Sequence, residues 1–314
     1  MRCIPLSQIL DGKALADKIC SDLKARVDAL QRWVDVSERG LPSIAGDANE
    51  VCDTTHRPRL LIVTSGDDAA SKVYVRNKVR RCEEIGIQVE VKHFDYLTAD
   101  DVLTIKSYHR PVIVQMPITG SVEMEALSNL LGDMYHCDVD GFVTTENVAH
   151  LATGRQPFHH PCTPKGIMRL LAEHAIPLEG KTVCIIGRSN IVGRPLSWMM
   201  EQAGATVTLC HSKTPERTLY QAAATADIIV SATGVRNVLT MDKLLHYASW
   251  NATDKVFVDV GMNRDENGKL CGDIDPLILQ ASAAYTPVPG GVGPMTVAML
   301  MENVVEYYER QVRT

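Results

Sequence analysis

Tyr74 and Lys78 are residue types whose spacing allows them to act together in catalysis. They stand four positions apart within residues 71–78, so a helix there places both side chains on one face. A lysine held in a dry pocket can take up and release a proton during a reaction. Tyrosine and lysine at this spacing also occur by chance on ordinary helices, so the spacing alone is a weak signal.

A Tyr-x-x-x-Lys pair is also typical of short-chain dehydrogenases. In those enzymes the pair follows the glycine-rich loop and lies in the same domain. Here Tyr74 and Lys78 precede the glycine loop at Gly187 and fall in a different predicted domain. The order of the motifs therefore argues against that class.

The glycine loop runs from Gly187 through Arg188 and Ser189 to Gly193, between a predicted strand and a predicted helix. Such a loop presents backbone N–H groups and a helix N-terminus to a pyrophosphate. Ser189 stands where the dinucleotide fingerprint has its second glycine, so the match is imperfect. The loop predicts a dinucleotide site.

The end of the next predicted strand bears on the choice of cofactor. NAD sites usually carry Asp or Glu there to hold the ribose hydroxyls, whereas this chain has Cys210, His211, Ser212 and Lys213. No carboxylate repels a 2′-phosphate, Ser212 can donate a hydrogen bond, and Arg188 can reach over from the glycine loop. This favours NADP over NAD. The alternative is an ordinary solvated turn.

Two segments lie where ligands bind in open α/β sheets or in nearby loops. Val114, Gln115 and Met116 end a predicted strand, the edge at which such sheets bind ligands. Asp138 and Asp140 share a short loop. Asp140 can hold an amidine-like ring edge through paired hydrogen bonds, and its alternative role is a turn or a helix cap.

A stretch rich in proline and glycine lies near the end of the chain. Three prolines and three glycines stand within residues 287–294. Proline fixes the backbone and glycine allows a ligand to come close. On composition alone the stretch is equally well a rigid linker or a wall for a flat ligand. The stretch includes Pro287, Val288, Pro289, Gly290 and Gly291.

Two series of alternating strands and helices must position these residues, which predicts an α/β fold with parallel sheets. The first series has strands at 59–64, 89–94 and 112–115 with helices at 69–85 and 99–108. The second has strands at 182–186, 206–210, 227–232, 256–260 and 284–286, the order of a Rossmann-like, doubly wound nucleotide domain. Helical patterns also begin near Ile9 and cover 196–202 and 295–310.

The pattern divides the chain into two predicted domains. An N-terminal α/β catalytic domain covers residues 1–162, and a Rossmann-like domain covers 163–293. The last helix, in residues 294–314, is expected to return to the first domain. Residues 157–164 form a proline-rich hinge candidate, with Gly293 and Pro294 turning the chain back. The polar segment 37–56 is expected to be a surface loop.

Composition excludes several classes of protein. The chain has 314 residues, is 45% hydrophobic and 22% charged, and carries a net charge of −6, which argues against a nucleic-acid coat or a membrane-surface protein. No apolar run is long enough to cross a bilayer. Nine scattered cysteines indicate reduced thiols and a cytoplasmic protein. His159, His160 and Cys162 lack a matching second pair, so no metal site is expected.

Taken in order, these segments make the chain similar to the bifunctional methylenetetrahydrofolate dehydrogenase/cyclohydrolase family. The resemblance covers nearly the whole length. Its motifs are Ile9-Leu10-Asp11-Gly12-Lys13, Tyr74-Val75 with Lys78, Gln115-Met116-Pro117, Asp138-Val139-Asp140-Gly141, Pro161-Cys162-Thr163-Pro164, Gly187-Arg188-Ser189 with Val192-Gly193, Cys210-His211-Ser212 and residues 287–296.

The resemblance implies two reactions of one-carbon metabolism, a pathway that feeds purine biosynthesis. Methylenetetrahydrofolate is oxidised with NADP, and the methenyl product is then hydrolysed to 10-formyltetrahydrofolate. Lys78 would be the acid and base of the hydrolysis, Gln115 its hydrogen-bond partner, Tyr74 a positioning residue and Asp140 the ligand of the pterin edge. The folate would also contact Val114, Met116 and residues 287–291, and NADP would contact Gly187, Arg188, Ser189, Ser212 and Met262.

The resemblance further implies a homodimer in the cytoplasm, or alternatively in mitochondria, without nucleic-acid or membrane partners. Two features depart from the family: Cys137 replaces a usual lysine, and segment 37–56 is long. Two rival functions are a dehydrogenase with weak cyclohydrolase activity and a non-catalytic nucleotide-binding protein. Retention of Tyr74, Lys78 and Gln115 speaks against both.

Overall fold

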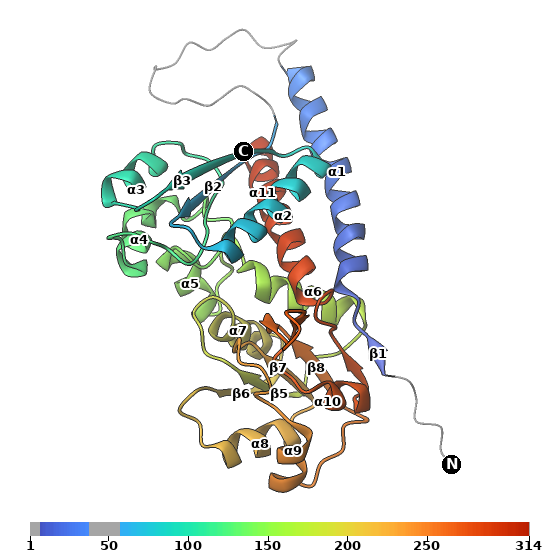
Figure 1. Ribbon diagram of the computed structural model, residues 1–314. Coiled ribbons are helices and arrows are strands. Elements are labelled where there is room, and N and C mark those ends of the chain that lie inside the picture. The colour runs from blue at the N-terminus through green and yellow to red at the C-terminus, as the bar shows by residue number, and fades with distance from the viewer. Residues whose placement is uncertain (1–6, 38–56, 314) are drawn as a thin grey trace. The chain divides into compact units, whose positions relative to one another are not determined.

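The computed structural model describes residues 7–37 and 57–313, which divide into two compact units. The six-stranded unit comprises the described residues up to Ala16 together with Asn147–Met299. The three-stranded unit comprises the described parts of Asp17–Glu146 and Leu300–Thr314. The predicted two-domain α/β architecture is confirmed (Figure 1).

The six-stranded unit is built on a parallel sheet with the order β1-β11-β8-β7-β5-β6. In β5, every residue after Thr182 is buried, as expected for a parallel strand covered on both faces. The strands of the sheet are β1 (Gln8–Ile9), β5 (Thr182–Ile186), β6 (Thr206–Cys210), β7 (Ile228–Ser231), β8 (Val256–Asp259) and β11 (Ala284–Tyr285). A separate antiparallel pair is formed by β9 (Asn263–Arg264) and β10 (Leu270–Cys271).

Helices follow the strands of this unit, and their apolar faces complete its core. One cluster joins Tyr220 and Phe257, both nearly inaccessible to solvent, with Ile278 and other buried side chains. The helices are α5 (Thr145–Ala152, which begins in the other unit), α6 (Cys162–Glu173), α7 (Gly193–Gln202), α8 (Glu216–Thr225), α9 (Met241–Tyr247) and α10 (Pro276–Ala281).

The three-stranded unit has a parallel sheet in the order β3-β2-β4. Its helix α2 begins after Asp68, whose carboxylate accepts the backbone N–H of Ser71, and ends at Gly86, which adopts φ 89°. Its elements are β2 (Arg59–Ser65), α2 (Ala69–Ile85), β3 (Gln88–Phe94), α3 (Ala99–Lys106), β4 (Val112–Val114), α4 (Met124–Leu130) and the 3-10 helix Gly132–Met134.

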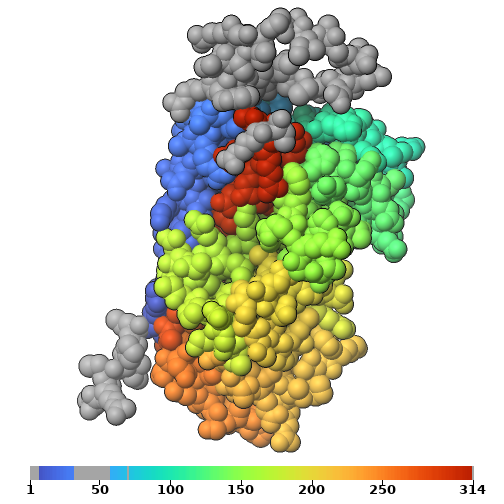
Figure 2. All heavy atoms as spheres, turned by 180° about the vertical axis from the view of Figure 1, so that it is seen from behind, coloured from blue at the N-terminus to red at the C-terminus, as the bar shows by residue number. Residues whose placement is uncertain are grey.

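Two long helices, α1 (Gly12–Ser37) and α11 (Val292–Arg313), contribute residues to both units. Within the three-stranded unit they lie side by side, as the blue and red surfaces in Figure 2 show. Arg26 of α1 donates two hydrogen bonds of 2.8 Å to the carboxylate of Glu309 of α11. The last helix therefore packs with the first part of the chain, as the sequence predicts.

Several boundaries differ from the prediction. Ile9 belongs to strand β1 rather than to a helix, because Gln8 and Leu10 donate backbone hydrogen bonds to the Ala283 and Tyr285 carbonyls. Gly293 and Pro294 lie inside the first turn of α11, where the missing N–H of proline costs no helical bond.

The six-stranded unit resumes at Asn147, before the predicted boundary at Cys162. Local hydrogen bonds account for this, since the Asn147 side chain accepts the Phe158 N–H and the Gln202 side chain donates to the Leu151 carbonyl. Most of the predicted surface loop 37–56 lies outside the described residues. Among the described helices, none combines the length and apolar character needed to cross a bilayer.

Candidate active site

Lys78 lies on α2 with only 8% of its surface exposed. Its Nζ donates a hydrogen bond of 3.1 Å to Oε1 of Gln115, the residue that follows β4. The Gln115 amide nitrogen donates at 2.9 Å to the Met116 carbonyl, which also accepts the Ser71 hydroxyl at 3.1 Å. The amide is therefore oriented with its oxygen toward the lysine, and the structure brings these predicted residues together.

Ser71 is a part of this arrangement that sequence reasoning missed. It stands one residue before Lys72 at the start of α2 and ties that helix to the segment after β4 through the Met116 carbonyl. The only sequence signal is its position seven residues before Lys78, which a helix places on the same face.

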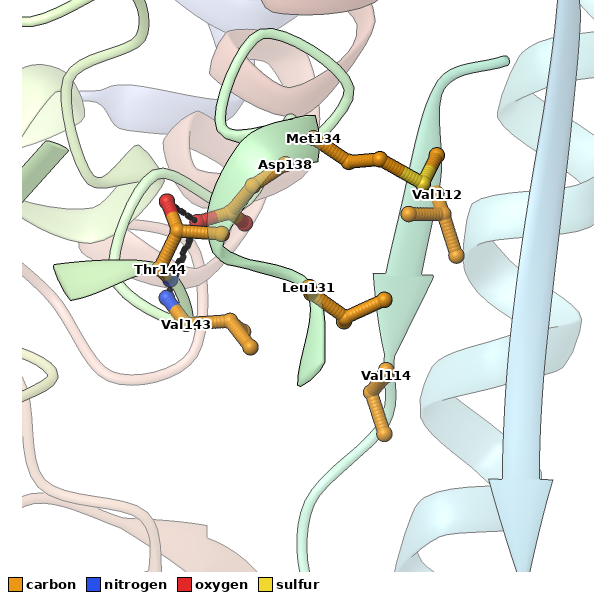
Figure 3. A pocket seen from close by; sticks show the side chains of 7 residues that line it. All are labelled: Val112, Val114, Leu131, Met134, Asp138, Val143 and Thr144. Atoms are coloured by element: carbon orange, nitrogen blue, oxygen red, sulfur yellow. Dashed lines mark hydrogen bonds between the residues drawn. The ribbon is translucent and has the colours of Figure 1, made fainter. Parts of the chain in front are cut away.

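Tyr74 is half-buried one helical turn before Lys78, and burial raises the pKa of its phenol. Val114 is almost fully buried at the end of β4. Its side chain lines a small cavity beside Asp138 rather than an open pocket (Figure 3). The cavity is too narrow to admit a water molecule, so a contact between Val114 and substrate would involve the Val114 backbone.

Asp138 organises the turn that carries Asp140. It is 2% exposed, and its carboxylate accepts hydrogen bonds from the backbone of Val143 and Thr144 and from the Thr144 hydroxyl (Figure 3). It also accepts the backbone N–H of Gly141. Burial raises the pKa of Asp138 to about 6, against the opposing effect of the Thr144 hydrogen bonds. The turn-capping role that was the alternative for Asp140 is thus performed by Asp138.

Asp140 differs sharply from its neighbour. It is 8% exposed, yet within residues 7–37 and 57–313 no group donates a hydrogen bond to its carboxylate, and Lys78 lies beyond hydrogen-bond reach. The turn continues through Gly141, which has φ 75°, a conformation that suits glycine. A carboxylate held with so little exposure and without a donor is suited to a ligand that supplies paired N–H groups.

In the other unit, the glycine loop leads from β5 into α7 with very close backbone packing. Gly187 has φ 118°, and a Cβ there would stand 2.3 Å from the Ala232 carbonyl oxygen. A Cβ on Gly193 would stand 1.9 Å from the Gly187 carbonyl oxygen. Ser189 fixes the loop by accepting the Val192 N–H at 3.1 Å, and Arg188 is exposed.

The turn after β6 holds the residues expected near a 2′-phosphate. The His211 N–H donates to the Thr214 hydroxyl at 2.9 Å, and the Lys213 N–H donates to His211 Nδ1 at 3.1 Å. Ser212 and Lys213 remain exposed, and residues 211–214 contain no carboxylate. The residues form an ordered turn that still presents a hydroxyl and a cation.

Two buried aspartates, Asp259 and Asp273, brace the loops after β7 and β8, and sequence reasoning missed both. Asp259 accepts the N–H groups of Gly261, Asp273 and Ile274, and burial raises the pKa of Asp259 to about 6. Asp273 accepts the Ser231 and Thr233 hydroxyls and the N–H groups of Thr233 and Gly234. Met262 follows in this braced region and is 47% exposed.

The proline–glycine stretch after β11 is held by backbone contacts within the six-stranded unit. The Gly290 carbonyl accepts the Lys13 N–H at 2.8 Å, and the Gly291 N–H donates to the Pro287 carbonyl at 2.8 Å. Pro289 is exposed, while Val288 is half-buried after a cis peptide bond to Pro289. The stretch is a fixed surface with few functional side chains, as a ligand wall requires.

In the part of the chain that the structure describes, no group of three or more His, Cys, Asp or Glu side chains converges. None of the seven described cysteines is in a disulfide, and six of them are buried. Burial raises the pKa of Cys137 to about 12, and its thiol lies 3.9 Å from the Tyr307 hydroxyl. This cysteine is a packed core residue.

Comparison with known proteins agrees with this arrangement. A family model described as the tetrahydrofolate dehydrogenase/cyclohydrolase catalytic domain matches residues 10–133, and the NAD(P)-binding domain of the same family matches residues 161–312. The bifunctional protein FolD of Paraburkholderia xenovorans is 40% identical over 97% of this chain and 98% of its own length.

Two solved structures extend this likeness. The bifunctional enzyme FolD from Campylobacter jejuni, a methylenetetrahydrofolate dehydrogenase/cyclohydrolase, has a TM-score of 0.81 at 36% identity and covers 97% of this chain and 99% of its own. The Trypanosoma brucei methylenetetrahydrofolate dehydrogenase-cyclohydrolase, complexed with NADP cofactor and inhibitor, has a TM-score of 0.82 at 26% identity. The match covers 99% of this chain and 100% of that chain. The chain therefore belongs to the tetrahydrofolate dehydrogenase/cyclohydrolase family.

Proposed function

We propose that this protein oxidises methylenetetrahydrofolate to methenyltetrahydrofolate with NADP and then hydrolyses the product to 10-formyltetrahydrofolate. Family membership over most of the chain supports both activities. The observation that carries the hydrolytic half is the buried Lys78, whose Nζ is held 3.1 Å from the Gln115 amide oxygen. Lys255 is equally buried but donates to the main-chain carbonyl of Ala226, whereas the partner of Lys78 is a side-chain amide that follows a parallel strand, where ligands bind in such sheets.

The glycine loop fits NADP. Its backbone can approach a pyrophosphate because Gly187 and Gly193 carry no Cβ, and α7 begins directly behind it. Arg188 and Ser212 are exposed and can hold a 2′-phosphate, which no carboxylate in residues 211–214 would repel. When bound, NADP accepts the hydride of the oxidation, so this unit's residues need only bind and align it.

Lys78 is the proposed acid and base of the second reaction. The methenyl substrate is a cationic amidinium, so a neutral lysine beside it is favoured over a charged one. Lys78 Nζ would take a proton from the water that attacks the methenyl carbon. The same proton would then pass to the ring nitrogen as its bond to that carbon breaks. The remaining proton of the added hydroxyl would leave to solvent as the C=O bond forms, so that the formyl group stays on the other nitrogen and one proton is released overall.

Gln115, Tyr74 and Asp140 have supporting roles in this proposal. Gln115 Oε1 accepts a hydrogen bond from Lys78 Nζ, and this contact would orient the rest of the amino group toward the substrate. Tyr74 lies one turn away on α2 and would position both the folate ring and the lysine. The Asp140 carboxylate would bind the N–H groups of the pterin edge, and residues 287–291 would also contact the folate.

A direct test incubates the purified chain with methylenetetrahydrofolate and NADP and follows both products. The expected result is formation of 10-formyltetrahydrofolate faster than uncatalysed hydrolysis allows. Accumulation of methenyltetrahydrofolate to the full oxidised total would leave a dehydrogenase alone. Absence of NADP reduction by a folded sample would overturn both activities.

The proposal extends to the assembly and the location of the protein. As in the family resemblance, the protein would act as a homodimer in the cytoplasm. The absence of disulfides among its described cysteines suits a reducing compartment. Sedimentation of the purified protein at several concentrations would test the dimer.

A further inference from the structure

The turn that carries Asp140 is anchored to β4 at its start. The Val112 N–H donates to the Cys137 carbonyl at 2.9 Å, and Asp138 pairs with Val112 in an isolated parallel bridge. Val139, the residue between the two aspartates, is fully buried. The backbone that leads to Asp140 is therefore part of the core, while Asp140 itself keeps 8% of its surface exposed.

Helix α11 holds the same backbone through two side chains. Asn303, which is 0% exposed, donates a hydrogen bond of 2.8 Å from its amide nitrogen Nδ2 to the Val139 carbonyl. Tyr307 lies one turn later, with its ring parallel to the His136 ring and its hydroxyl 3.9 Å from the Cys137 thiol. Residues four apart share a helix face, so one face of α11 contacts this segment.

The Val139 carbonyl bears directly on the residue that follows it. This carbonyl belongs to the same planar peptide unit as the N–H of Asp140. A hydrogen bond to the carbonyl therefore fixes the plane from which the Asp140 residue begins. Asn303 makes that bond, so it restrains the direction in which the Asp140 side chain leaves the turn.

Asparagine is an unfavourable residue for this position unless its amide is bonded. Asn303 lies in the middle of α11, among the buried apolar residues Leu300, Met301 and Val304. Asparagine is a poor helix former, and burying an amide without a partner costs free energy. The amide thus interrupts an apolar helix face and donates to the Val139 carbonyl.

We propose that Asn303 is a positioning residue for folate binding. Its bond to the Val139 carbonyl holds the Asp140 carboxylate in the orientation that accepts the N–H groups of the pterin edge. This role rests on the proposed contact between Asp140 and the pterin, and it extends the folate site to a residue of α11. Because Asn303 acts through Asp140, its loss should weaken folate binding and leave NADP binding unchanged.

Asn303→Ala in the full chain removes the donor without adding bulk. We expect KM for methylenetetrahydrofolate to rise about tenfold and KM for NADP to change less than about twofold, since a misoriented residue weakens only the ligand that it binds. Asn303→Leu, which keeps the side chain large, is a second variant with the same expected result. Circular dichroism shows whether each variant is folded.

Tyr220→Phe is the matched control. It removes another buried side-chain donor to a main-chain carbonyl, because the Tyr220 hydroxyl donates to the Val238 carbonyl at 3.2 Å in the six-stranded unit. This variant should lose stability and keep the wild-type KM for methylenetetrahydrofolate. An equal rise of KM in Tyr220→Phe and Asn303→Ala would attribute the effect to lost stability and overturn the positioning role.

A double-mutant cycle tests whether Asn303 acts through Asp140. Asp140→Ala alone should raise KM for methylenetetrahydrofolate at least about tenfold, because the pterin loses its paired hydrogen bonds. In that background Asn303→Ala should add less than about twofold, since no carboxylate remains to be positioned. Independent effects would instead multiply in the double variant, and that result would overturn the positioning role.

The remaining outcomes separate this role from the proposed chemistry. An unchanged KM in a folded Asn303→Ala variant, with Asp140→Ala impaired, would remove the role of Asn303 and leave the contact between Asp140 and the pterin in place. Failure of both Asn303 variants to fold would mean that the amide serves the core and not the folate site. An unchanged KM in Asp140→Ala would contradict the pterin contact itself, and the role of Asn303 with it.

Discussion

The two units prepare for their ligands in different ways. The three-stranded unit relies on side chains: a buried lysine held by an amide, and a carboxylate with no donor of its own. The six-stranded unit relies on bare backbone, because a Cβ at Gly187 or Gly193 would collide with a carbonyl oxygen. Proton transfer needs groups that titrate, whereas binding a pyrophosphate needs N–H groups and space. Substitutions should therefore separate the two activities.

Lys78→Met should have the largest effect. Loss of the acid and base should lower cyclohydrolase kcat by about 10³-fold or more, while part of the dehydrogenase activity remains. Absorbance of methenyltetrahydrofolate measures each reaction separately. Its formation from methylenetetrahydrofolate and NADP reports the dehydrogenase, and its loss when it is supplied directly reports the cyclohydrolase. Lys72→Met on the same helix, at a lysine whose side chain is 60% exposed, is the matched control. Equal loss of both activities in a folded variant would mean that Lys78 binds the substrate and does not act as acid or base.

The buried carboxylates should produce the next largest effect, on stability. Asp138 has a folded pKa of about 6 against an ordinary value of 3.8, so the folded chain binds its proton more tightly than the unfolded chain. The stabilisation that the folded chain gains from binding this proton is full below pH 3.8 and is lost as the pH rises through 6. Relative to Asp138→Asn, the wild type should lose about 3 kcal/mol of unfolding free energy across this window.

Urea unfolding of both proteins at several pH values between 4 and 8 measures this difference. Asp259→Asn provides the companion experiment in the other unit, since burial raises the pKa of Asp259 to about 6 as well. A difference between wild type and variant that does not change with pH would show that the carboxylate is already satisfied by its hydrogen bonds.

Gly187→Ala should impair only the dehydrogenase. The added Cβ meets the Ala232 carbonyl at 2.3 Å on a backbone with φ 118°, so the loop must shift at a cost of about 1–3 kcal/mol. We expect a rise of roughly tenfold or more in KM for NADP, with hydrolysis of added methenyltetrahydrofolate retained. Gly180→Ala shares a positive φ but has open space at the Cβ position. Similar NADP defects in both variants would attribute the effect to general strain.

Arg188→Ala should have the smallest effect and the most specific one. Without the guanidinium, KM should rise about tenfold for NADP and change little for NAD. A rise of about tenfold corresponds to the loss of one charge-assisted hydrogen bond to the 2′-phosphate. Steady-state kinetics with both cofactors on one enzyme preparation give the ratio. Equal changes for the two cofactors would remove Arg188 from the 2′-phosphate site.

Much of the fold follows from sequence patterns alone. Helix α2 begins and ends at the predicted residues because Asp68 and Gly86 cap it. Strands β5 and β6 were also placed correctly. β5 is an apolar run of the kind that suits a buried parallel sheet, whereas β6, last in the sheet order, alternates between exposed and half-buried residues before the buried Cys210. Strand β1 was missed because two residues carry no alternation, and only tertiary pairing with β11 makes them a strand.

The site was less accessible to sequence reasoning. The resemblance pointed to Lys78 and Gln115, and their spacing across β4 could not have revealed a contact between residues 37 positions apart. Asp138 and Asp140 have the same chemistry and nearly the same position, so only the fold shows which one receives the backbone donors. The roles of the site residues in catalysis remain predictions.

The division of labour between Asp138 and Asp140 has a consequence for how this enzyme family can change. Because the Asp138 carboxylate, and not that of Asp140, accepts the donors of the turn, a substitution at Asp140 removes none of these hydrogen bonds. Selection can therefore alter the residue proposed to read the pterin ring without first finding a compensating change in the scaffold. The turn can therefore keep its conformation while the side chain at position 140 changes, which makes it a starting point for enzymes with other heterocyclic substrates.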